Sequence, residues 1–432
     1  MTLNTILTVL CASQLAQAAD APASVTYHRQ VVRILQARCQ GCHRPGEIGP
    51  MSFLTYKETR PWAAAIKEAV TVRKMPPWSA DTSGQRFSDN PSLSDAEIKT
   101  LVDWAKNGAP EGDARDTPPP LAFTEGWNIG KPDVTFEMPE DYEVPAKGAI
   151  PYTYVILPGK FERDTWIRSA EIRPGNRAVV HHVNSLVRDP KSTWLREYPV
   201  GKPFVPQESG SPESRIASGA AFTGYTPGQG PMNLSPGQGK LIKAGSDIVL
   251  QIHYTTNGKP AKDRTKIGMV FATEFPTQRV MRLLVLDRNF VIPPGVSDYP
   301  VKGVFTVQSD CELISVRPHM HYRGKAMEMS AVYPDGRREA LLSLPHYDFE
   351  WQFNYGLEKP KHLPKGTQIE AVGHFDNSPN NLRNPDPKAE VRWGDQTWEE
   401  MMVGFFEVAF DPKLEPRDIV IAPNPVSDPP RN

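Results

Sequence analysis

This sequence contains little cysteine, no long apolar run after its N-terminal stretch, and no excess of one charge. Only four cysteines occur among 432 residues: Cys11 is near the N-terminus, Cys39 and Cys42 form a close pair, and Cys311 stands alone. Such a set excludes a disulfide framework. Beyond the N-terminal stretch there is no run of about eighteen apolar residues, so we expect no membrane span. The net charge of −1 gives no indication of nucleic-acid or anionic-membrane binding.

Proline and glycine, in contrast, are abundant. The 44 prolines and 31 glycines favour short strands and many turns over a helical bundle. The length predicts roughly two to four domains. Residues 1–18 have an apolar core that ends with Ala16 and Ala18 in an A-x-A arrangement, so we expect a signal peptide and a periplasmic or secreted protein.

The motif Cys39-x-x-Cys42-His43 dominates the first expected domain, residues 26–113. It is the attachment signature of haem c, in which both thiols add to the haem vinyl groups and the histidine binds iron. Met75, before two prolines, is the expected second axial ligand, and Met51 is a competing candidate more easily explained as a core residue. A thioredoxin-like disulfide or half a zinc site is the other interpretation of the cysteine pair.

Amphipathic helices are expected on both sides of this motif. One precedes Cys39, and the other follows a capping serine, Ser92 or Ser94, in "SLSDAEIKTLVDWAKNGAP". The order of helix, haem motif, methionine loop and C-terminal helix resembles a class I cytochrome c. The resemblance implies one covalent haem c with His/Met ligation, which suits electron transfer.

Residues 114–131 form a proline-rich linker, and beyond it the pattern changes to short alternating apolar runs. Two series of such runs predict two all-β sandwich domains, residues 132–286 and 287–425. The segment 203–239, rich in Ser, Gly and Pro, is expected to be a long loop or lid. The fold class is therefore a small helical domain followed by two β-sandwiches.

Five of the ten histidines fall within apolar strand segments of the two sandwiches. Adjacent His181 and His182 can reach one metal only at a bulge or strand end, and His253 could complete that site. Three neutral imidazoles suit copper, zinc or iron. His319 and His321, at i and i+2 on a strand, project to one face.

A methionine from "TWEEMMVGFF" would complete the second site with a soft sulfur donor, which favours Cu(I). Zinc rarely uses a thioether, so this donor argues for copper. Met401 is preferred to Met402 as the ligand because of the resemblance described next.

Order and spacing of these six residues resemble the copper type II, ascorbate-dependent monooxygenases, the family of peptidylglycine α-hydroxylating and dopamine β-monooxygenases. The family's methionine directly follows an acidic residue, as Met401 does here. The resemblance implies two jelly-roll-like copper domains facing a cleft. It implies an electron-transfer copper bound by His181, His182 and His253. It also implies a second copper, bound by His319, His321 and Met401, where O2 and substrate react.

The expected reaction is hydroxylation of an aliphatic C–H bond of a small organic substrate with O2. Arg317 stands where peptide-amidating members carry a carboxylate-binding arginine, and Tyr322 is another candidate substrate residue. Val403 and Phe405 replace a polar pair of those members, which argues against a C-terminal glycine peptide as substrate. The fused cytochrome is expected to pass electrons to the first copper, replacing or supplementing ascorbate or another redox partner.

The alternative function is that of an exported copper carrier or cytochrome electron shuttle without oxygenase activity. Retention of all six ligand residues argues against it.

Metal and haem content tests this interpretation. We expect two coppers and one covalent haem c per chain, measured by elemental analysis and by the haem absorption spectrum of the denatured chain. A chain that holds a single zinc instead would contradict the assignment.

Overall fold

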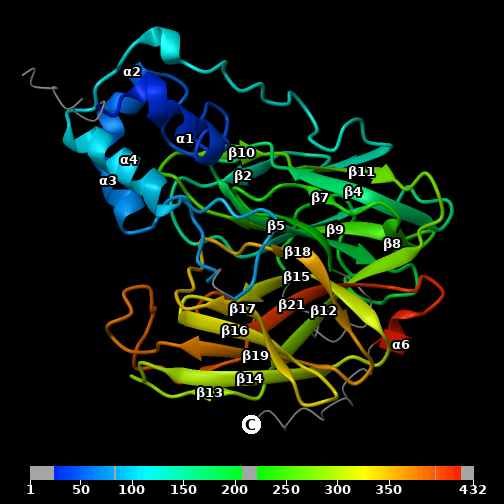
Figure 1. The fold of residues 1–432 in the computed structure, drawn as a ribbon. Coiled ribbons are helices and arrows are strands. Elements are labelled where there is room, and N and C mark those ends of the chain that lie inside the picture. Colours follow the sequence, from blue (N-terminus) through cyan, green and yellow to red (C-terminus); the bar gives the residue numbers. More distant parts are fainter. Residues whose placement is uncertain (1–23, 82–83, 207–220, 395, 420–432) are drawn as a thin grey trace, which may run out of the picture.

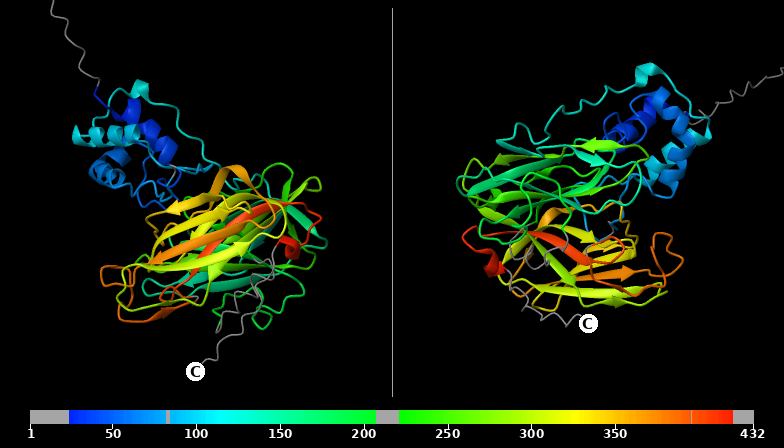
Figure 2. Two further views of the ribbon diagram at one scale, coloured as in Figure 1. Left: turned by 60° about the horizontal axis from the view of Figure 1, so that its bottom comes forward. Right: turned by 180° about the vertical axis from the view of Figure 1, so that it is seen from behind.

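The computed structural model describes residues 24–81, 84–206, 221–394 and 396–419. A small helical unit and two β-sandwiches pack against one another, with the helical unit at the top of Figure 1 and the second sandwich at the bottom (Figures 1 and 2). The expected signal peptide lies outside the described residues. Within them, no helix is long and apolar enough to cross a membrane, as expected.

The N-terminal unit consists of short helical segments around a small apolar core. The helical elements are η1 (Tyr27–Val31), α1 (Val32–Arg38), α2 (Tyr56–Thr59), η2 (Arg60–Trp62), α3 (Ala63–Thr71), α4 (Asp95–Lys106) and η3 (Ala114–Asp116). Both predicted helices are present. Ser94, rather than Ser92, caps α4 in a capping box with Glu97. Leu101 and Trp104 of α4 are fully buried in the core. The helix α3 was not predicted from the sequence.

The first sandwich has two antiparallel layers. Its strands are β1 (Val134–Glu137), β2 (Tyr142–Val144), β3 (Thr153–Leu157), β4 (Thr165–Arg173), β5 (Val180–Arg188), β6 (Ala221–Tyr225), β7 (Met232–Asn233), β8 (Gln238–Ile242), β9 (Asp247–Tyr254), β10 (Ala261–Asp263) and β11 (Lys266–Phe271). One layer has the order β1-β11-β4-β8 and the other β3-β9-β5-β6. Apolar side chains from both layers form one core between them.

The second sandwich has the same construction. Its strands are β12 (Gln278–Asp287), β13 (Val291–Ile292), β14 (Tyr299–Thr306), β15 (Cys311–His319), β16 (Gly324–Val332), β17 (Arg338–Leu344), β18 (Tyr355–Leu363), β19 (Gln368–Phe375), β20 (Val391–Arg392) and β21 (Met402–Phe410), followed by α6 (Pro416–Ile419). The layers are β12-β21-β15-β18 and β14-β19-β16-β17, with a separate apolar core.

Three expectations about the sandwiches need correction. β12 pairs with β21 along its whole length, so it belongs to the second sandwich and the boundary lies before Gln278 rather than at residue 287. Part of the expected loop 203–239 forms β6, because Phe222 and Thr223 are buried against the neighbouring strand β5. Residues 349–354, predicted as strand, precede β18 without regular structure.

The three parts are closely joined. Residues 78–81 and 84–88, which follow α3, run along the second sandwich: Trp78 packs edge-on against Tyr355 at a centroid distance of 4.8 Å, and Phe87 pairs with Leu357 of β18. Between the sandwiches, the ends of β8 and β12 pair in parallel, so one layer of each sandwich continues into the other. The expected first domain is therefore not separate from the second sandwich.

Buried charges hold the junction between the sandwiches. Glu407 of β21 accepts hydrogen bonds from Lys240 Nζ of β8 at 2.7 Å and from Arg282 Nη2 of β12 at 3.0 Å, and Ser315 donates to its other oxygen. Burial alone would raise the pKa of Glu407, but the two cations lower it to about 2. The carboxylate is therefore the counter-charge on which both cations depend.

Replacing Glu407 with glutamine should lower the free energy of unfolding by about 3–5 kcal/mol, because two buried cations lose their counter-charge. Since the native pKa is depressed, the stabilisation is complete above the unfolded-state pKa of about 4.3 and is lost as the pH falls toward about 2. Urea unfolding at several pH values measures the difference. Glu162→Gln, at an exposed position, is the control, and an equal effect of both variants would contradict the assignment.

Candidate metal centres

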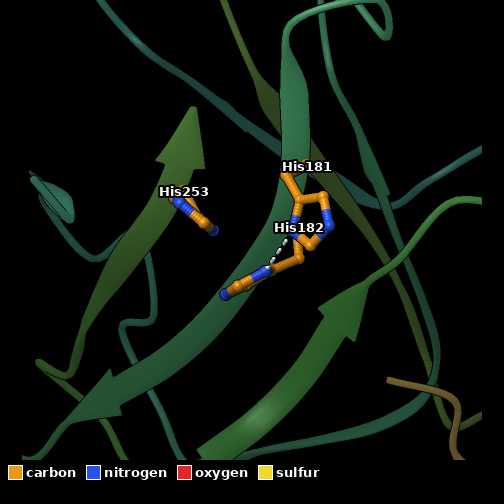
Figure 3. A group of neighbouring side chains, drawn as sticks. All are labelled: His181, His182 and His253. Carbon is orange, nitrogen blue, oxygen red and sulfur yellow. Dashed lines mark hydrogen bonds between the residues drawn. The ribbon is translucent and has the colours of Figure 1, made fainter. Parts of the chain in front are cut away.

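The first candidate centre lies on β5 and β9. His182 stands directly opposite His253 in the ladder, and the register shifts between Val180 and His182, so His181 occupies a β-bulge. The bulge turns His181 to the same side as His182. A bulge or strand end was predicted here, because two adjacent strand histidines can reach one metal only at such a position. One ligand atom from each of the three side chains lies within 4.8 Å of the others (Figure 3).

The three imidazoles form a cluster that could hold a metal ion. His181 Nδ1 and His182 Nδ1 face each other at 3.0 Å, and among the described residues none bonds to the buried Nδ1 of His253. Burial lowers the pKa of His182, and burial together with His181 lowers that of His253 to about 3. The two buried rings are therefore neutral at physiological pH, which is the form that binds a metal.

The second candidate centre lies where β15 ends. His319 is the last residue of that strand, and His321 lies two residues beyond it; their ring centroids are 5.2 Å apart. Between them, Met320 points into the core, and its backbone N–H and carbonyl both bond to the hydroxyl of Tyr347, at 3.0 and 2.7 Å. The alternation holds the two imidazoles on one side, as predicted from their i, i+2 spacing.

Each of these rings has a defined hydrogen-bond partner. His319 Nδ1 donates to Gln352 Oε1 at 2.6 Å, and His321 Nδ1 donates to the carbonyl of Glu399 at 3.3 Å. Burial and the neighbouring His319 lower the pKa of His321 to about 3. Such bonds through one ring nitrogen orient an imidazole for a ligand at the other.

Met401 and Met402 differ in where they point. Met402, the first residue of β21, is fully buried in the core of the second sandwich. Met401 lines the same cavity as His319 and His321. The preceding Glu400 is fully buried and accepts from the backbone N–H of His321 at 2.8 Å, which ties this turn to the histidine pair. The geometry favours Met401 as the sulfur donor.

A cavity of about 140 Å³ lies between the two sandwiches and reaches both centres. His182 lines it from the first sandwich, and His319, His321 and Met401 line it from the second. The wall formed by β5, β6 and β9 is mainly polar and includes Asn184, Ser185, Thr223 and Gln251. The wall formed by β12 and β21 is mainly apolar and includes Leu284, Leu286, Val403 and Phe405. His182 of the first group and both histidines of the second thus face one cavity.

The two candidate substrate residues lie in different surroundings. Arg317 is buried in the cavity wall, and its Nε has no hydrogen-bond partner among the described residues. Burial and the nearby Arg282 lower its pKa to about 10, so it stays cationic at neutral pH. Tyr322 packs edge-on against Phe349 at 4.9 Å and is not among the described residues that line the cavity.

The Cys39–His43 turn lies against both sandwiches. The carbonyl of Cys39 accepts from the backbone N–H groups of Cys42 and His43, and both thiols are free, as thioether attachment of haem requires. Cys42 Sγ and the ring of Phe353 both lie within 4 Å of the point where a Cβ on Gly228 would stand. Cys42 of the motif therefore lies beside Gly228 of the first sandwich, and Phe353 of the second sandwich approaches the same glycine.

The two methionines considered as axial ligands differ in environment. Met51 packs against the apolar core of the helical unit, which agrees with its interpretation as a core residue. Met75 follows α3, half-buried, in the segment that leads to the second sandwich. His43 stacks on Phe53 at a centroid distance of 4.5 Å, and burial lowers its pKa, so its ring is neutral and suited to a metal ion.

Comparisons with known proteins add no family assignment. No protein-family model and no curated protein match the sequence. The structure of infectious bursal disease virus Gt strain covers 66% of this chain and 72% of its own at 9% identity and a TM-score of 0.19. The structure of allantoicase covers 55% of this chain and 79% of its own at 12% identity and a TM-score of 0.15. The STIV MCP covers 58% of this chain and 97% of its own at 10% identity and a TM-score of 0.18. Likenesses at these TM-scores support no statement about fold or function.

Three residues of the second sandwich that contact the histidines were not predicted from the sequence. Phe349 stacks on His181, Glu350 accepts a hydrogen bond from His181, and Gln352 accepts one from His319. They lie in the stretch predicted as strand. The carboxylate and amide in "FEWQFNY" were the available indication, but nothing in their spacing relates them to histidines far away in the sequence.

Substitution of the two methionines separates their roles. Met402→Ala should lower the free energy of unfolding by about 2–5 kcal/mol, because it leaves a cavity in the core. Met401→Ala should leave unfolding close to that of the parent chain and weaken Cu(I) binding instead. Urea unfolding and Cu(I) titration against a competing chelator measure the two effects. Weaker Cu(I) binding by Met402→Ala, with Met401→Ala unaffected, would reverse the assignment.

Proposed function

We propose that this chain is an exported, copper-dependent monooxygenase that hydroxylates an aliphatic C–H bond of a small organic substrate with O2. The observation that carries the proposal is the shared cavity, because His182 of the first centre faces it together with His319, His321 and Met401 of the second. Two metal centres at one cavity are suited to a reaction that needs more than one electron at the same substrate.

The donor sets support copper at both centres. One ion would be held by the three imidazoles of His181, His182 and His253. The buried Nδ1 of His253 has no hydrogen-bond partner among the described residues, and metal coordination would satisfy it. His319, His321 and Met401 would hold the other. Copper supplies one-electron redox chemistry, and the thioether at the second centre favours the reduced ion that meets O2.

The reaction balances with an external source of electrons. One oxygen atom enters the C–H bond and the other leaves as water, so each turnover consumes two electrons and two protons. A haem c on Cys39 and Cys42, with His43 and Met75 as axial ligands, would pass on the two electrons one at a time, and the two protons would come from water. The position of Cys42 beside Gly228 supports this, because Phe353 also approaches Gly228 and the neighbouring Gln352 is hydrogen-bonded to His319. Ascorbate or a redox partner protein would reduce the haem or the copper.

The cavity walls indicate the class of substrate. About 140 Å³ accommodates a small molecule, and the apolar side chains Leu284, Leu286 and Phe405 offer a surface for an aliphatic group. Arg317 offers a cationic donor at the same cavity, and its buried, unpartnered Nε would be satisfied by an acceptor from the ligand. The preferred substrate is therefore a small aliphatic molecule with an anionic or strongly accepting group.

Oxygen uptake tests the proposed reaction. The copper-loaded holoprotein with a reductant should consume O2 and form a hydroxylated product from one member of a panel of amines, peptides and small aliphatic acids. Met401→Ala should abolish hydroxylation and leave the haem absorption spectrum unchanged, because the haem motif is not in contact with that side chain's cavity.

Two further outcomes of the same experiment are informative. Full copper loading without O2 consumption on any substrate would favour the copper carrier or electron shuttle. In rapid mixing, the reduced haem should be reoxidised by the copper(II)-loaded chain but not by the metal-free chain. Haem that stays reduced in both would contradict the proposed route of electrons.

A further inference from the structure

The segment Phe349–Phe353, which we call the bridging segment, belongs to the second sandwich but contacts histidines of both. It runs between Asp348 and β18 without regular structure. Its contacts with the first sandwich are formed by Phe349 and Glu350, and its contact with His319 by Gln352. Both candidate metal centres therefore depend on one short piece of chain.

Glu350 supplies the outer partner of His181. The Nε2–H of His181 donates to Glu350 Oε2 at 2.8 Å, while its Nδ1 faces the Nδ1 of His182. This bond lowers the pKa of Glu350, so the group is a carboxylate at neutral pH. Arg383, itself bonded to Asp348, lies 3.8 Å from the other oxygen of Glu350. A carboxylate behind an imidazole orients the ring and makes its other nitrogen a stronger metal donor.

Phe349 and Gln352 complete the contact. The ring of Phe349 stacks on His181 at a centroid distance of 5.8 Å and meets His321 edge-on at 6.3 Å, so one side chain lies between the two centres. Gln352 Nε2 donates to the carbonyl of Phe349 at 3.1 Å, which directs its Oε1 to His319. The segment is thereby stiffened by its own side chain.

We propose that the bridging segment is a positioning element for both metal centres and that Glu350 is the outer carboxylate of the first one, supplied across the boundary between the sandwiches. Metal binding at His181, His182 and His253 then fastens the second sandwich to the first through the His181–Glu350 bond. The inference rests on metal binding at these histidines, which is part of the proposed function, but it does not depend on the reaction.

Zinc binding to the full chain tests the role of Glu350, because Zn²⁺ accepts three imidazoles and has no redox chemistry. His321→Ala, which removes a ligand of the second centre, serves as the background, so that titration calorimetry follows the first. Adding Glu350→Gln should weaken Zn²⁺ binding about 10–100-fold. Glu350→Asp, which keeps the carboxylate, should restore part of the affinity. Glu358→Gln, on an exposed glutamate of β18, should have no effect.

Hydrogen exchange supplies a readout that loss of a merely structural contact would not move. Zn²⁺ bound at the first sandwich should slow amide exchange in residues 348–355 of the second, and Glu350→Gln should abolish that protection. Equal affinity and equal protection in the parent and in Glu350→Gln would overturn the inference alone. Absence of Zn²⁺ and copper binding by the His321→Ala chain would overturn it together with the proposed function.

Discussion

The docking of the two sandwiches is the constraint on which the rest of the structure depends. Parallel pairing of β8 with β12 continues one layer into the next, and the buried Lys240–Glu407–Arg282 cluster closes the junction. A buried cluster of this kind tolerates little displacement, because separation of the charges would leave each of them desolvated and unpaired. The relative position of the two histidine groups therefore follows from this junction, and so does the cavity between them.

Burial determines the chemical state of the candidate ligands. Removal from water disfavours the imidazolium, so His182, His253 and His321 remain neutral well below the pH at which an exposed histidine would protonate. The same low polarity makes an unpartnered donor costly, as at His253 Nδ1 and Arg317 Nε. Both atoms are at the proposed centres or their shared cavity, where an ion or a substrate group would satisfy them. Elsewhere in the described part of the chain, buried Arg188 is paired with Asp247, and Lys240 and Arg282 are paired with Glu407.

The helical unit is integrated with the sandwiches rather than attached by a linker alone. Its Cys39–His43 turn lies beside Gly228, which Phe353 of the second sandwich also approaches, and the segment after α3 pairs with β18. A haem c on Cys42, as proposed, would therefore lie near the bridging segment, which contacts both histidine groups. Under the proposed function, the fusion of these units in one chain would replace a diffusive encounter between separate proteins by a fixed arrangement.

Much of this organisation could be predicted because local patterns encode it. Period-two alternation identified most strands, the Ser94–Glu97 capping box began α4, and adjacent His181 and His182 required the bulge that the structure contains. The i, i+2 spacing of His319 and His321 likewise fixed their common side, whatever the rest of the chain does. The haem motif and the six metal-binding candidates were therefore determined by the sequence itself, as residues capable of that chemistry.

Only the tertiary structure decided which of these residues meet. The pairing of β12 with β21, the burial of Met402 while Met401 faces the cavity, and the approach of Glu350 to His181 have no local signature. The last contact joins residues 169 positions apart on different sandwiches. Contacts of this kind depend on how two finished layers dock, which side-chain spacing along a single strand does not encode.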